Sequence, residues 1–122
     1  MLLALVVTAC EEESDMSNVS DEAKRDYLTT LYAEILSLAQ SEVCTDGGDW
    51  NYVGIGFKPC GGYSHYLAYH KDVDKETLID KVNSYTLLEK EFVIGQGLIS
   101  DCAIVSVPQG VTCEEEKPVL VY

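Results

Sequence analysis

Two long segments with helical periodicity, each followed by two short strand-like segments, constrain the fold of this chain more than any other feature. In the first, from about Asp21 to Glu42, apolar residues recur every three or four positions, which is typical of a helix with one buried face. The second, from about Lys75 to Ile94, has the same spacing. Asn18 or Ser20 is expected to cap the first helix, and Asp74 the second. The buried faces are predicted to carry Leu28, Leu31, Ile35 and Leu38 in the first helix, widened by Tyr32 and Ala39, and Leu78, Val82, Tyr85, Leu88 and Phe92 in the second.

Four segments are predicted to be strands. Tyr52 to Phe57 and Tyr63 to His70 are separated by a proline- and glycine-rich turn, so we expect an antiparallel hairpin. Asp101 to Val107 and Pro118 to Tyr122 are the other two, with a turn at Pro108-Gln109-Gly110 between them. The order α-β-β-α-β-β predicts an α+β fold, in which both amphipathic helices pack on one face of a small antiparallel sheet of about four strands.

The N-terminus has the pattern expected of an export signal. An apolar run from Leu2 to Val7 leads directly into Val7-Thr8-Ala9-Cys10. Small residues before a cysteine, after such a run, resemble the lipobox of bacterial lipoproteins. The resemblance implies that residues 1–9 are a signal peptide and that Cys10 is acylated. The protein would then be held by lipid in the bacterial cell envelope, at the outer membrane. No basic residue precedes Lys24, although signal peptides normally begin with one, and the alternative is a buried N-terminal strand with a free cysteine.

Residues 10–19 are predicted to be an acidic tether, because they contain too few apolar groups to fold. Glu11-Glu12-Glu13 directly after Cys10 resembles the tag that sends some Gram-negative lipoproteins to the outer cell surface. A plain solvated linker is the alternative. Residues 20–122 are then expected to form a single α+β domain.

The chain has five cysteines. If Cys10 carries lipid, four remain, and an even number in a small exported domain predicts two disulfides. Four cysteines allow three connectivities, of which we favour the local pairs Cys44–Cys60 and Cys102–Cys113. No two of these cysteines are two to four residues apart, the spacing usual in structural zinc sites, so no metal site is expected.

The formal net charge of −13 excludes some classes of partner. Nucleic acid requires clusters of Lys and Arg to neutralise phosphates, and a protein surface this acidic does not favour anionic lipid either. The expected contact with the membrane is therefore through the N-terminal lipid alone. A basic protein partner is compatible with the charge.

The sequence predicts no catalytic residues and no cofactor. Gly62-Tyr63-Ser64-His65 is not a nucleophile elbow, and the adjacent Ser64 and His65 are expected on opposite faces of a strand. Asp46-Gly47-Gly48-Asp49 lacks the alternating acids of a calcium loop and is interpreted as a polar turn. Gly54-Ile55-Gly56 does not continue as a dinucleotide-binding motif.

An aromatic, glycine-rich segment supplies the candidate binding residues, which are Trp50, Tyr52, Lys58, Tyr63 and Tyr66. Exposed aromatic side chains beside glycine turns are common recognition surfaces, and the alternative is that they pack as core under the first helix. The stretch from Trp50 to Tyr69 is similar to one in small lipid-anchored bacterial proteins of unassigned activity, and the resemblance brings no known site with it.

These observations predict a lipid-anchored, non-enzymatic binding module whose partner is another protein. One concrete form is an inhibitor of a protease or wall hydrolase, with Lys58 as the inserting side chain and Pro59 resisting cleavage. Two alternatives stay open: a small hydrolase using Asp46 and Asp49 with a histidine, and a structural component of the envelope.

Overall fold

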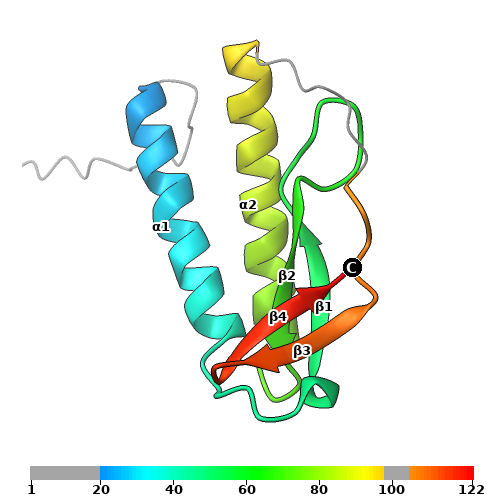
Figure 1. Cartoon of the computed structure of the whole chain (residues 1–122). Coiled ribbons are helices and arrows are strands. Elements are labelled where there is room, and N and C mark those ends of the chain that lie inside the picture. The colour runs from blue at the N-terminus through cyan, green and yellow to red at the C-terminus, as the bar shows by residue number, and fades with distance from the viewer. Residues whose placement is uncertain (1–19, 98–104) are drawn as a thin grey trace, which may run out of the picture.

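The computed structural model describes residues 20–97 and 105–122. Its elements are α1 (Asp21–Ala39), a short 3-10 helix η2 (Gly47–Asp49), β1 (Trp50–Ile55), β2 (His65–His70), α2 (Lys75–Gln96), β3 (Gly110–Glu114) and β4 (Lys117–Val121). The predicted α+β class and the order α-β-β-α-β-β are confirmed. The two helices lie side by side and antiparallel, next to the β1–β2 hairpin (Figure 1).

Both helices begin at capping side chains that the sequence predicted. The Ser20 hydroxyl accepts a hydrogen bond from the backbone N–H of Ala23, and the Asp74 carboxylate accepts one from that of Thr77. Helix α1 ends at Ala39, before the expected Glu42. Helix α2 extends to Gln96 and ends at Gly97, whose φ of 63° is the left-handed conformation that glycine adopts readily at helix C-termini.

Strands β1 and β2 form the predicted antiparallel hairpin, with Trp50 opposite His70 and Ile55 opposite His65. Because side chains alternate along a strand, the hairpin has two different faces. One face packs against the helices. The other carries Trp50, Tyr52 and its cross-strand partner Ala68.

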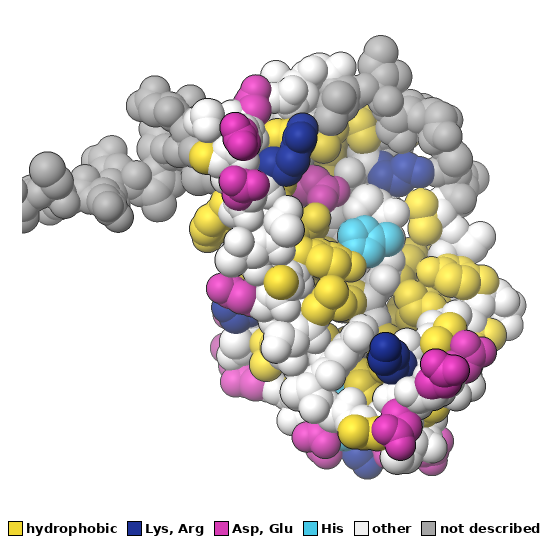
Figure 2. Space-filling model, turned by 60° about the vertical axis from the view of Figure 1, so that its left-hand side comes forward, with side chains coloured by type: hydrophobic (Ala, Val, Ile, Leu, Met, Phe, Trp, Pro, Cys, Tyr) yellow, Lys and Arg dark blue, Asp and Glu magenta, His cyan; other side chains and the backbone are white. Residues whose placement is uncertain are grey.

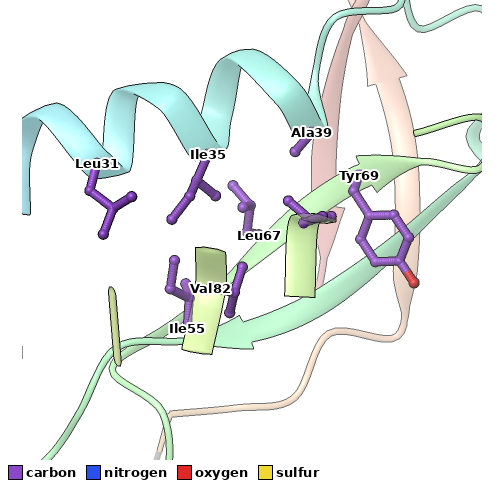
Figure 3. Close-up of a cluster of buried hydrophobic side chains, with 8 residues drawn as sticks. Leu31, Ile35, Ala39, Ile55, Leu67, Tyr69 and Val82 are labelled. Atoms are coloured by element: carbon purple, nitrogen blue, oxygen red, sulfur yellow. The ribbon is translucent and has the colours of Figure 1, made fainter. Parts of the chain in front are cut away.

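The main core lies between the two helices and the inner face of β1–β2 (Figure 3). Ile35 of α1 and Ile55 of β1 have no exposed surface, and Leu78 of α2 is equally buried. Completing this core are Leu31, Ala39, Leu67, Tyr69 and Val82. The helical stripes read from the sequence therefore supply the residues that hold the helices to the hairpin.

The expected single sheet of about four strands is wrong: β1–β2 and β3–β4 are two separate two-stranded sheets. The second hairpin packs on the outer face of the first through side chains. Val111 and Leu120 contact a small cluster formed by Cys44, Trp50 and Ala68. The hairpins therefore meet by side-chain packing, and the described strands form no backbone ladder between β2 and β4.

The position of the third strand also differs from the prediction. Residues 105–107 are not in a strand, and 101–104 lie outside the described residues. Strand β3 instead begins at Gly110, within the expected turn, and the hairpin closes at Glu115 and Glu116. Their φ values of 50° and 63° are conformations that normally call for Asn or Gly in a two-residue turn, so the acidic pair gave no hairpin signal.

The disulfide connectivity corrects both favoured pairs. Cys44 is bonded to Cys113, which excludes Cys44–Cys60 and Cys102–Cys113. The expected pair Cys44–Cys60 does not form because Cys44 precedes β1 and Cys60 follows it. The six extended residues of β1 span about 20 Å, much more than the distance across a disulfide. Cys60 is disulfide-bonded as well, and Cys102 lies outside the described residues.

The loop around Cys44 holds the second hairpin in place. The backbone N–H of Cys44 donates to the carbonyl of Glu116 at 3.0 Å. Gly47 lies so close to the carbonyl of Val111 that no side chain would fit there.

The signal peptide, Cys10 and the acidic tether lie outside the described residues. Within residues 20–97 and 105–122, neither helix combines the length and apolar character needed to cross a bilayer.

Candidate functional site

A groove with two adjoining cavities follows helix α1. The first, which we call the helix cavity, has a volume of about 350 Å³ and lies between α1 and α2. The second, the strand cavity, measures about 430 Å³ and lies between α1, β2 and the segment from Pro118 to Tyr122. Tyr32 is part of the lining of both cavities. Figure 2 shows one face of the molecule, on which hydrophobic side chains gather near a histidine.

A chain of hydrogen bonds connects the groove to β2. The Tyr32 hydroxyl is 3.0 Å from Nε2 of His65, and Nδ1 of His65 is 2.9 Å from Oγ of Ser64. The Ser64 hydroxyl donates its only hydrogen to the carbonyl of Ile55, at 3.1 Å. Oγ of Ser64 must therefore accept from Nδ1–H of His65, and Nε2 accepts from Tyr32.

This arrangement corrects the expectation that Ser64 and His65 point apart. Strand β2 begins at His65, so Ser64 lies in the preceding turn and the alternation of a strand does not apply to it. The contact does not make a nucleophile, because the imidazole nitrogen facing Ser64 carries a proton and cannot accept another.

Burial keeps the groups of this network neutral. It lowers the pKa of His65 below 6.5, and the Glu89 carboxylate only partly opposes the effect. Burial raises the pKa of Tyr32, and the negative charge of Glu89 raises it further. The pKa of Tyr85 is also raised, by burial and by its hydrogen bond to Glu89.

Glu89 connects α2 to the turn after β1. Its Oε1 accepts from the backbone N–H of Phe57 at 3.0 Å, and the neighbouring Thr86 hydroxyl accepts from that of Gly56 at 3.1 Å. Gly56 has a φ of 86°, and a side chain there would collide with Ser64. Thr86 and Glu89 of α2 therefore hold the turn through the backbone N–H groups of Gly56 and Phe57.

Three of the predicted binding residues lie together, and one of them, Tyr66, lines the strand cavity. The Tyr66 ring is 5.9 Å from that of Tyr52 and 6.1 Å from that of Tyr63, both edge to face. A side chain at Gly54 would overlap the Tyr63 ring, which is 49% exposed. These tyrosines are on the hairpin face away from the helices or in the turn, so they do not pack as core under α1.

The other two predicted residues are not part of that surface. Trp50 is only 8% exposed and packs edge to face on His70, at 5.1 Å between ring centroids. Lys58 is half-buried and takes part in an interaction within the molecule. Trp50 is therefore buried, and Lys58 is partly buried.

The residues of the hydrolase alternative have structural roles. Asp46 accepts a hydrogen bond from the backbone N–H of Gly48 at 2.9 Å, and Asp49 forms an ion pair with Lys71 at 3.1 Å. The histidines are on opposite faces of β2, as predicted, with His65 toward α1 and His70 against Trp50. Among the residues that the structure describes, no group of three or more His, Cys, Asp or Glu side chains could hold a metal ion.

Sequence reasoning missed the groove itself. Tyr32 and Tyr85 were assigned only to buried helical stripes, and Glu89 was not considered. Tyr85 and Glu89 are four residues apart and so adjacent on a helix, which could have indicated a polar pair within an apolar face.

Comparison of the chain with protein-family models, curated proteins and solved structures gives no match.

Proposed function

We propose that this chain is a non-enzymatic, lipid-anchored binding module of the bacterial envelope, and that the groove along α1 holds an extended segment of a partner protein. The observation that carries the proposal is the pair of cavities along α1 that share Tyr32 in their lining. Protein partners are usually recognised through aromatic anchors that enter or line such hollows.

The length of the groove suits a short peptide. Along α1 it extends from Arg25 to Gln40, and 15 residues of helix rise about 22 Å. About seven residues of extended peptide span the same distance. Its lining changes from Arg25 and Glu89 at one end to Tyr66, Leu120 and Tyr122 at the other, so a bound segment would have a preferred direction.

The closed hydrogen-bond network supports a binding role over a catalytic one. The hydrogens of Tyr32, of neutral His65 and of Ser64 are all used within the chain of contacts. Among the residues that the structure describes in this network, no base is left in position to activate the serine. An inhibitor that inserts Lys58 into an enzyme receives no support, because that residue is half-buried.

Site-specific photo-cross-linking in intact cells tests the groove. The photoreactive residue p-benzoylphenylalanine replaces Tyr66 or Tyr122 in the full chain, and the matched control replaces Leu87, which is 62% exposed and lines neither cavity. We expect the same cross-linked protein from both groove positions and none from Leu87. Equal cross-linking from all three positions, or none above background, would contradict the proposal.

The anchor is tested separately by mass spectrometry of the native chain. We expect the mature chain to begin at Cys10 and to carry acyl groups. An intact Met1 with an unmodified Cys10 would exclude the lipoprotein interpretation, and it would leave the groove untouched.

A further inference from the structure

We infer that the helix cavity is a binding site for one basic side chain, lysine or arginine, of the partner segment. The inference rests on the proposed function and adds to it the chemistry that one end of the groove recognises. It is carried by three aromatic rings, by one carboxylate and by Arg25, which the chain itself places over the Phe92 ring.

The aromatic side chains of the cavity are Tyr32, Tyr85 and Phe92. The two tyrosine rings are 5.4 Å apart and inclined by 51°, so they form an angled wall. Aromatic faces carry partial negative charge and attract ammonium and guanidinium groups that lie within about 6 Å of the ring centre.

Arg25 places such a group over one of these rings. Its guanidinium carbon lies 5.7 Å from the centre of the Phe92 ring. Arg25 is exposed, so its side chain can move into solvent when another cation takes the ring face. The chain's own arginine therefore occupies a position that a partner's basic side chain would take.

Glu89 supplies the negative charge. Its carboxylate lines the cavity and accepts hydrogen bonds from the backbone of Phe57 and from Tyr85. A carboxylate has about four acceptor positions, so capacity is left for an incoming donor. The formal net charge of −13 would also draw a basic partner toward the molecule.

The test uses small probes of defined charge, titrated into the full chain and followed by NMR of the rings of Tyr32, Tyr85 and Phe92. Nα-acetyl-lysine methylamide carries the ammonium group. The norleucine analogue keeps the aliphatic stem without the charge. Acetate serves as the anion. We expect shifts that saturate with the lysine probe and no saturable response to the other two.

Three variants identify the groups responsible. Glu89→Gln keeps the hydrogen-bond acceptor for Phe57 and should weaken binding of the lysine probe by about tenfold. Glu91→Gln removes the same charge from an exposed position of α2 that does not line this cavity, and it should change affinity less than twofold. Arg25→Ala removes the competing cation and should strengthen binding severalfold.

Several outcomes would overturn the inference. They are equal binding of the norleucine probe, equal weakening by Glu89→Gln and Glu91→Gln, and weaker lysine binding in Arg25→Ala. Acetate binding that Arg25→Ala abolishes would also overturn it, because the cavity would then be an anion site. If the cross-link at Tyr122 forms and the lysine probe fails, only this inference falls. If the probe binds as expected and no partner cross-links, the proposed function falls instead.

Discussion

His65 joins α1 to β2 through a side chain that stays neutral. Its Nε2 accepts from Tyr32, a bond whose direction protonation of the ring would reverse. Burial lowers the pKa of His65 in the folded chain, while the unfolded chain keeps a value near 6.5. Below that pH the unfolded state binds a proton that the folded state does not.

We therefore expect the stability contributed by neutral His65 to be complete above about pH 6.5 and to be lost progressively as the pH falls. Urea unfolding between pH 7.5 and 5.5 measures the effect as a decreasing free energy of unfolding. His65→Gln should flatten this decrease, whereas His70→Gln, which keeps the Tyr32–His65 bond, should retain it. A slope unchanged by His65→Gln would show that other groups cause it.

At the scale of elements, a disulfide attaches the second hairpin to the rest of the fold. Cys44 and Cys113 are 69 residues apart in sequence, and their bond holds β3 to the loop that precedes β1. The same loop contacts this hairpin at the Glu116 carbonyl. The small cluster around Trp50 and Ala68 completes the attachment.

Replacing both cysteines, Cys44→Ala with Cys113→Ala, should lower the free energy of unfolding by about 4 kcal/mol, because the unfolded chain regains the freedom of a long loop. Urea unfolding followed by circular dichroism measures the loss. A change below about 1 kcal/mol would mean that the packing around Trp50 holds the hairpin without the covalent bond.

At the scale of the whole molecule, the excess of acidic residues opposes compaction. A formal net charge of −13 on 122 residues produces repulsion that is stronger in the folded state than in the expanded one. Charges on the surface are screened by salt, with a screening length of about 10 Å at 0.1 M.

We expect the melting temperature to rise as the sodium chloride concentration increases from about 10 to 300 mM. Over this range the screening length falls from about 30 Å to below 10 Å, so repulsion between distant acidic groups is weakened. Differential scanning calorimetry on the full chain measures it, and replacing chloride with another monovalent anion should give the same rise. A fall with salt would indicate that attractive ion pairs, such as Lys71–Asp49, dominate over the net repulsion.

Local signals account for most of what could be predicted. The stripe that contains Ile35, the cap at Asp74 and the pairing of β1 with β2 all depend on residues close together in the chain. Predicting the candidate site required knowledge of how the helices pack. Tyr52, Tyr63 and Tyr66 were found because they are near one another in sequence, whereas Tyr32 and Glu89 reach the groove from helices that pack side by side.

By itself, the sequence determined where the helices begin, which stripe of each helix contains its buried residues, and that two strands follow each helix, since periodicity and capping act within a few residues. Tertiary structure alone decided that the sheets are separate, that Cys44 bonds Cys113, and that Tyr32 meets His65. These contacts join segments distant in the chain, and side-chain packing between whole elements selects among many pairings that are locally equivalent.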